Sequence, residues 1–152
     1  MTRREFVSGT FRSADVRLAG IMDQFAAETL DHVAVTVTDV ARSKLFYSGV
    51  LGLRELPRPS TFDFPGAWFT IGSSTIHLLG RPQPDTSSPR HFCLWVADVR
   101  AAARKVESSG CRVEWHSKHK IPGVDRFFTY DPDGNRIEVQ GRDDDGDASA
   151  VP

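Results

Sequence analysis

Residues 90–99 read RHFCLWVADV, and residues 31–40 read DHVAVTVTDV. In each stretch a histidine opens an alternating apolar pattern, and an aspartate follows the histidine by seven residues. His32 and His91 are 59 residues apart, and so are Asp39 and Asp98. A repeat of this kind predicts two copies of one supersecondary unit. The two histidines would then hold equivalent places in the fold.

The alternation in each stretch has the period of a β-strand, and each aspartate is a good N-cap for a helix that follows it. The predicted helices cover roughly residues 40–49 and 99–108. The patterns after them predict three further strands in each unit, at residues 51–56, 67–71 and 74–79 in the first and 111–115, 126–130 and 136–140 in the second. Each unit therefore reads βαβββ, with module one at residues 31–80 and module two at residues 90–140.

Composition limits the class of protein. The chain has 152 residues, of which 39% are hydrophobic and 26% charged, as expected for one globular domain. A net charge of −1 gives no support to a nucleic-acid or anionic-membrane partner. No apolar run is long enough to cross a bilayer. With only Cys93 and Cys111 present, a disulfide framework is not expected, and a reducing, cytoplasmic location is the default.

Two segments lie outside the repeat. Residues 1–30 form an N-terminal extension, in which Ser13 could cap a helix running through Leu18 and Phe25. No function is predicted for this extension. Residues 141–152 are acidic and rich in small residues, and they are predicted to be a disordered tail.

Strand parity separates two faces in each module. One face carries valine, leucine, isoleucine and phenylalanine, which would pack under the helices. The opposite face carries His32, His77, His91 and Glu138. The predicted fold class is α+β, with the two βαβββ modules forming a curved mixed sheet around a cleft lined by these four side chains. On the same face Cys93 is expected to be a small buried residue, because no activating base is evident.

Imidazole nitrogens and carboxylate oxygens are ligands for divalent zinc, nickel, iron, manganese or cobalt. The lack of thiolates in the set argues against a closed structural zinc site. Four ligands around an octahedral ion would leave two positions for water or a chelating substrate. The pattern therefore predicts a divalent-metal site, and it does not identify the metal.

The sequence resembles the vicinal oxygen chelate superfamily, the glyoxalase, bleomycin-resistance and extradiol-dioxygenase group. The resemblance covers residues 31–140 and depends on the order and spacing of several short motifs. These motifs are Asp31-His32-Val33-Ala34-Val35, Phe46-Tyr47 with Val50-Leu51-Gly52-Leu53, Ile76-His77-Leu78-Leu79, Arg90-His91-Phe92 with Val96-Ala97-Asp98-Val99, and Asp131-Pro132-Asp133-Gly134-Asn135-Arg136-Ile137-Glu138.

The resemblance implies a metal-dependent enzyme in which His32, His77, His91 and Glu138 are the ligands, as at the matching positions of the glyoxalase I branch. That branch usually has glutamate where this chain has His77. His77 and Glu138 are the candidates for catalytic roles, and Glu138 would act as a ligand alone or as a ligand that detaches to move a proton. Three histidines and one glutamate leave a divalent ion with a formal charge near +1, which predicts a preference for an anionic chelator such as an enolate, catecholate or phosphonate.

Three functions remain open. The first is a glyoxalase-like lyase or isomerase, or a related epimerase or thiol transferase, acting on a small chelating substrate. The second is an iron(II) extradiol-type dioxygenase, and the third is a non-catalytic drug-binding resistance protein. Members of the group are often dimers, and an exposed sheet edge on each module favours a homodimer. The modules could pair within one chain or between two.

Overall fold

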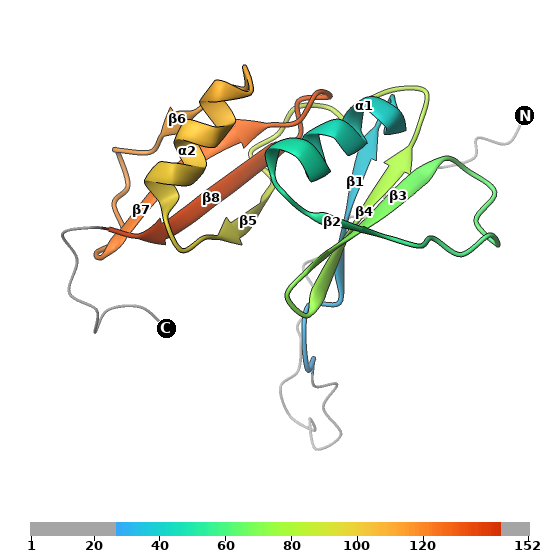
Figure 1. The fold of residues 1–152 in the computed structure, drawn as a ribbon, viewed down its shortest axis with the longest axis horizontal. Helices are drawn as coiled ribbons and strands as arrows, with labels where there is room; N and C mark the ends of the chain where they lie inside the picture. The colour runs from blue at the N-terminus through green and yellow to red at the C-terminus, as the bar shows by residue number, and fades with distance from the viewer. Residues whose placement is uncertain (1–26, 144–152) are drawn as a thin grey trace, which may run out of the picture.

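The computed structural model describes residues 27–143, and it contains two four-stranded mixed sheets (Figure 1). Module one contains β1 (His32–Val37), β2 (Arg54–Leu56), β3 (Gly66–Ile71) and β4 (Ser74–Gly80), in the order β1-β4-β3-β2. Module two contains β5 (His91–Trp95), β6 (Glu114–Trp115), β7 (Val124–Tyr130) and β8 (Arg136–Arg142), in the order β5-β8-β7-β6. The predicted α+β class and the two βαβββ modules are confirmed.

The register of the two sheets is equivalent. The first strand of each module pairs in parallel with its last strand, and the other pairs are antiparallel. Ala34 lies opposite His77, and Cys93 lies opposite Glu138. Ala34 and Cys93 each follow the first-strand histidine of their module by two residues, so His77 and Glu138 occupy matching places. The repeat seen in the sequence is thus a repeat in three dimensions.

The helices begin where the sequence predicts. Asp39 accepts a hydrogen bond from Arg42 N at 3.0 Å and caps α1 (Val40–Lys44). Asp98 accepts one from Ala101 N at 2.8 Å and caps α2 (Val99–Ser108). The predicted helix over 40–49 differs in its second half, which is a π-helix, η1 (Leu45–Val50). This π-helix contains Tyr47, which is completely buried.

The modules pack through the end of β1, η1 and the turn between β7 and β8. Tyr47 donates a hydrogen bond to Asp131 Oδ2 at 3.0 Å, and Asn135 Nδ2 donates one to the Thr36 carbonyl at 2.8 Å. Thr38 Oγ1 and Thr38 N both donate to Asp133, at 2.5 Å and 3.1 Å. Figure 1 shows the η1 segment lying between the two sheets. β1 and β5 are edge strands of separate sheets.

Element boundaries differ from the prediction at several ends. β2 and β6 are short, because only Arg54–Leu56 and Glu114–Trp115 pair with their neighbours. β8 continues two residues beyond the predicted end at residue 140. The helix predicted around Ser13 lies outside the described residues. Between residues 27 and 143 there is no helix of the length and apolar character needed to cross a membrane.

Candidate metal centre

The two ligand-type side chains of module one are in ring contact. The His32 and His77 rings stack with centroids 4.3 Å apart and an interplanar angle of 12°. On its other side His77 stacks on Trp68, at 4.2 Å and 7°. The strand register explains the second contact, because Trp68 lies directly opposite His77 on β3. Module one therefore presents three parallel rings in a row.

Oxygen atoms hold one nitrogen of each ring in this pair. His32 Nδ1 lies 2.7 Å from Asp31 Oδ2, and His77 Nε2 lies 2.9 Å from Thr75 Oγ1. The contact with Asp31 leaves His32 Nε2 available as a ligand. Burial lowers the pKa of His77 below its usual value, and neighbouring His32 lowers it further. His77 is therefore a neutral imidazole at pH 7, the form that binds metals.

The two ligand-type side chains of module two are hydrogen-bonded. His91 Nε2 lies 2.8 Å from Glu138 Oε2, and His91 Nδ1 lies 2.9 Å from the Pro89 carbonyl. A carbonyl oxygen only accepts, so Nδ1 carries a proton. Glu138 is 5% exposed, and its second oxygen accepts a hydrogen bond from Arg126 Nη1 at 2.9 Å. Both oxygens of this buried carboxylate thus have partners.

The donor chemistry of module two fits a cation. With the Nδ1 proton of His91 committed to Pro89, Nε2 and Glu138 Oε2 face each other and need a shared positive species between them. A divalent ion bound by both atoms would be such a species, since histidine nitrogens and carboxylate oxygens are metal ligands. The residues present therefore fit a divalent metal.

One chain does not bring the four predicted ligands together. Within residues 27–143, no three histidine, cysteine, aspartate or glutamate side chains converge as a metal-binding group. His32 with His77 and His91 with Glu138 instead form two separate pairs. Predicted site residues are thus placed at equivalent positions in the two modules, and the four-ligand set stays a prediction.

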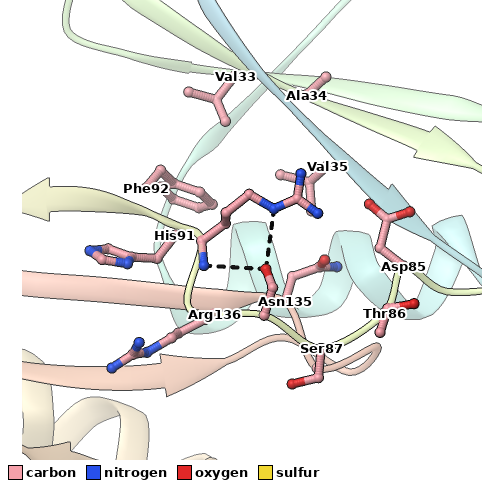
Figure 2. Close-up of a pocket in the computed structure, with 13 residues that line it drawn as sticks. Val33, Ala34, Val35, Asp85, Thr86, Ser87, His91, Phe92, Asn135 and Arg136 are labelled. Carbon is pink, nitrogen blue, oxygen red and sulfur yellow. Dashed lines mark hydrogen bonds between the residues drawn. The ribbon is translucent and has the colours of Figure 1, made fainter. Parts of the chain in front are cut away.

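Two hollows lie between the modules. One, of about 210 Å³, is bounded by β1, the linker before β5 and the turn before β8. In Figure 2 the His91 and Arg136 side chains point the same way, away from Asp85 in the linker. The other, of about 530 Å³, lies between the β3–β4 turn and the β5 residues Cys93 and Trp95. Both hollows include Val33 of edge strand β1 and His91 of edge strand β5.

Some neighbouring residues differ from expectation. Cys93, predicted to be buried, is exposed in the chain. Partial burial of its thiol and the nearby Glu138 charge nevertheless raise the pKa of Cys93 to about 12, so the thiol stays protonated and unreactive. Of the aromatic residues, Phe128 packs its ring edge-to-face with His91 at 5.3 Å, whereas Trp95 is 46% exposed.

Two contacts were not predicted from the sequence. The contact between Asp31 and His32 had a signal, since the two residues are adjacent. The contact between Arg126 and Glu138 had a weaker one. Phe128 lies opposite Glu138, and alternation along β7 puts Arg126 on the same face as Phe128.

Comparison with known proteins gives the family. Residues 29–139 match the family model described as the Glyoxalase/Bleomycin resistance protein/Dioxygenase superfamily. The chain is 30% identical to Glyoxylase I 4 of Arabidopsis thaliana over 122 residues, which are 73% of this chain and 69% of that protein. It is 28% identical to Glutathione transferase FosA of Serratia marcescens over 119 residues, 74% and 79% of the two chains.

Solved structures agree with this result. A glyoxalase family protein from Bacillus anthracis superposes with a TM-score of 0.72 at 26% identity, covering 79% of this chain and 99% of that one. The family match spans well over half of the chain, and the fold of the relative matches over the same region. The chain belongs to the Glyoxalase/Bleomycin resistance protein/Dioxygenase superfamily.

Proposed function

We propose that the protein is a divalent-metal-dependent, glyoxalase-like enzyme acting on a small chelating substrate, with His32, His77, His91 and Glu138 as metal ligands. One observation carries the proposal. In each module an oxygen holds Nδ1 of the first-strand histidine, Asp31 for His32 and the Pro89 carbonyl for His91. Such contacts fix the tautomer and orientation of metal-binding histidines. They leave Nε2 of His32 available to an ion, and they leave Nε2 of His91 facing the carboxylate that would share the ion with it.

The working unit of this proposal is a homodimer. The two ligand pairs lie on different modules, and β1 and β5 are both sheet edges. Pairing β1 of one copy with β5 of another would bring one pair from each copy together and cover both edges. Because a two-fold axis makes such contacts twice, the dimer would contain two equal sites.

The bound ion would polarise a substrate oxygen or acidify a bound water. The side chains of this protein would orient the ligands and move the proton. His77 is the better candidate for proton transfer, because it is neutral and its Nε2 contacts only the Thr75 hydroxyl. Glu138 is held through both of its oxygens. Its catalytic role would be to bind and position the ion.

The charge around the site favours an anionic substrate. Three histidines and Glu138 leave a formal charge near +1 on a loaded site. Two guanidinium nitrogens of module two, Arg126 Nε and Arg136 Nε, are buried without a hydrogen-bond partner in the described part of the chain. A buried unpaired donor is costly, and an anionic group on a ligand would satisfy it. Enolates, catecholates and phosphonates combine that charge with chelating oxygens.

A second candidate is transfer of a thiol to a small phosphonate electrophile. It is favoured by the likeness to Glutathione transferase FosA and by the two unpaired guanidinium nitrogens. The two candidates differ in their substrates. Turnover of a hemithioacetal supports the glyoxalase-like reaction, and thiol-dependent loss of an epoxide phosphonate supports transfer. Oxygen consumption with iron(II) and a catechol would support a dioxygenase instead.

Metal analysis tests the site itself. The purified protein, stripped and reloaded, should take up one divalent ion per chain by elemental analysis. His91→Ala and Glu138→Ala should abolish uptake, and His116→Ala, a histidine outside the proposed set, should leave it unchanged. A protein with all four residues that recruits no divalent metal would reject the enzyme readings and favour a non-catalytic binding protein.

Mixing variants tests the dimer. A module-one variant, His32→Ala/His77→Ala, and a module-two variant, His91→Ala/Glu138→Ala, should each bind no metal. If sites form between copies, refolding the two together regenerates one intact site in each mixed dimer, or about a quarter of wild-type metal. Sites formed within one chain would not be regenerated at all.

A further inference from the structure

Arg126 joins the candidate ligand Glu138 to a loop of the same module. Its Nη1 donates to Glu138 Oε1 at 2.9 Å, and its Nη2 donates to the His119 carbonyl at 2.5 Å. The Arg126 side chain is 15% exposed. The guanidinium is planar and largely excluded from solvent, and its hydrogen bonds to a carboxylate and to a backbone carbonyl fix its position. Arg126 is therefore a rigid partner for one oxygen of the carboxylate.

The two oxygens of Glu138 are thereby made different. Oε2 faces His91 Nε2, the other ligand-type atom of module two, and Oε1 faces Arg126. A free carboxylate can bind a metal through one oxygen or through both. Here Oε1 is already used, and using it for an ion would break its contact with a buried cation.

Module one has no such arrangement. In the matching register position, Gly66 replaces Arg126, opposite Leu79 as Arg126 is opposite Gln140. A side chain at Gly66 would strike the Leu78 carbonyl, which lies 2.5 Å from a built Cβ. His77, the counterpart of Glu138, also has one ligand atom to offer at a time. The arginine clamp, meaning the contact of Arg126 with Glu138, thus occurs in module two, where the ligand is a carboxylate with two equivalent oxygens.

We propose that Arg126 is a positioning residue that restricts Glu138 to one-oxygen metal binding, through Oε2, and so keeps a coordination position available for a chelating substrate. The inference rests on the proposed function, because it needs the metal site. It adds a role that the family match does not assign. Without Arg126, Glu138 would bind the metal through both oxygens and fill a second coordination position. A substrate with two oxygens would then find only one position open.

The test uses the full-length protein loaded with cobalt(II), whose visible spectrum reports coordination. Acetohydroxamate is the two-oxygen probe and azide the one-position probe. In Arg126→Met, acetohydroxamate affinity should fall about tenfold more than azide affinity, the scale of effects from partners of metal ligands. The cobalt spectrum without probe should also change. Loss of charge alone would weaken both anions by the same factor.

Three further variants sharpen the result. Arg126→Lys keeps the charge and one donor, so it should restore the wild-type ratio of the two affinities. Arg112→Met removes a charge from module two outside the proposed site, where Arg112 pairs with Glu114, and the ratio should not change. Arg126→Gln retains a neutral polar side chain and replaces the methionine variant if that one does not fold.

The outcomes separate the two proposals. Cobalt binding by the wild type, with equal losses for both probes and an unchanged spectrum in Arg126→Met, would overturn the role of Arg126 and leave the metal site intact. A wild-type protein that binds no cobalt would overturn the proposed function and this inference with it. A selective loss for acetohydroxamate, restored by lysine, would support both.

Discussion

The two modules share topology and register, but their site faces differ in charge. In module one, His32, His77 and Trp68 form a stack of aromatic rings. In module two, His91, Glu138 and Arg126 form a chain of charge-assisted hydrogen bonds. The matched places of His77 and Glu138 thus carry side chains of different charge with different partners. Equivalent backbone positions set where ligands lie, and the residue types decide how firmly each ligand is held.

The last turn of each module differs as well. In module one β3 and β4 are joined by Gly72 and Ser73, which are exposed. In module two the turn of residues 131–135 is a hydrogen-bonded centre that contacts module one. Of these two turns, the one in module two therefore carries the hydrogen bonds to the other module. Substitutions at matching turns should have very different effects, which gives the first test of the comparison.

Asp131→Ala should have the largest effect on stability. Asp131 is 5% exposed and accepts hydrogen bonds from Tyr47, Asp133 N and both nitrogens of Asn135. Its loss would leave buried donors unpaired, and we expect the free energy of unfolding to fall by about 3–5 kcal/mol. Urea denaturation measures this. Ser73→Ala, in the matching turn, should change it by less than about 0.5 kcal/mol, and equal losses would refute the asymmetry.

Tyr47→Phe should have the next largest effect. Tyr47 is fully buried, and its hydroxyl donates to Asp131 across the modules. Phenylalanine keeps the ring packing but removes this hydrogen bond, so the free energy of unfolding should fall by about 1–2 kcal/mol. In a double-mutant cycle with Asp131→Ala, the double variant should lose less unfolding free energy than the sum of the two single losses. Simple additivity would show that the hydroxyl acts elsewhere.

His77→Glu makes the two faces more alike. The loaded site would lose its formal positive charge, so affinity for an anionic chelator such as methylphosphonate should fall about tenfold, or about 1.4 kcal/mol. Titration calorimetry on the metal-loaded protein measures it. His77→Gln, which removes the imidazole without adding charge, is the matched control and should lose less. Equal or tighter binding by the glutamate variant would contradict the charge argument.

Local pattern was enough to predict most of this fold. Strand alternation and the two capping aspartates predicted both modules and placed His77 and Glu138 on the face of the histidines. The π-helix was missed, because periodicity in the sequence does not distinguish it from an α-helix. The contact of Arg126 with Glu138 was missed because it joins two residues that are 12 positions apart in sequence and lie on neighbouring strands.

The arrangement of the modules was beyond the reach of the sequence. Edge strands β1 and β5 could meet within a chain or between chains, since the same residues and patterns serve both arrangements. The linker of residues 81–90 carries no signal that chooses between them. The contacts of Tyr47, Thr38 and Asn135 with their partners fix how the two modules pack within one chain, and these contacts are tertiary packing. The sequence thus predicted the positions of His32, His77, His91 and Glu138 in the modules, and their joint role as ligands stays a prediction.

Asp133→Asn should have the smallest effect, and it should depend on pH. Burial works to raise the pKa of Asp133, but hydrogen bonds from Thr38 and the charge of Arg42 outweigh it, so the pKa lies below its usual value. A carboxylate with a depressed pKa stabilises the folded state above its unfolded pKa of about 4. That contribution disappears as pH falls through the folded pKa.

The wild type should therefore exceed Asp133→Asn by about 1 kcal/mol in unfolding free energy at pH 7, with the difference shrinking below about pH 4. Urea denaturation at pH 7, 4 and 3 follows it. Asp63→Asn, an exposed loop carboxylate, should differ little from the wild type at pH 7. A difference for Asp133 that stays constant from pH 7 to 3 would mean that its charge does not hold the modules together. The asymmetry would then reside in the bonds of Tyr47 with Asp131 and of Asn135 with Thr36.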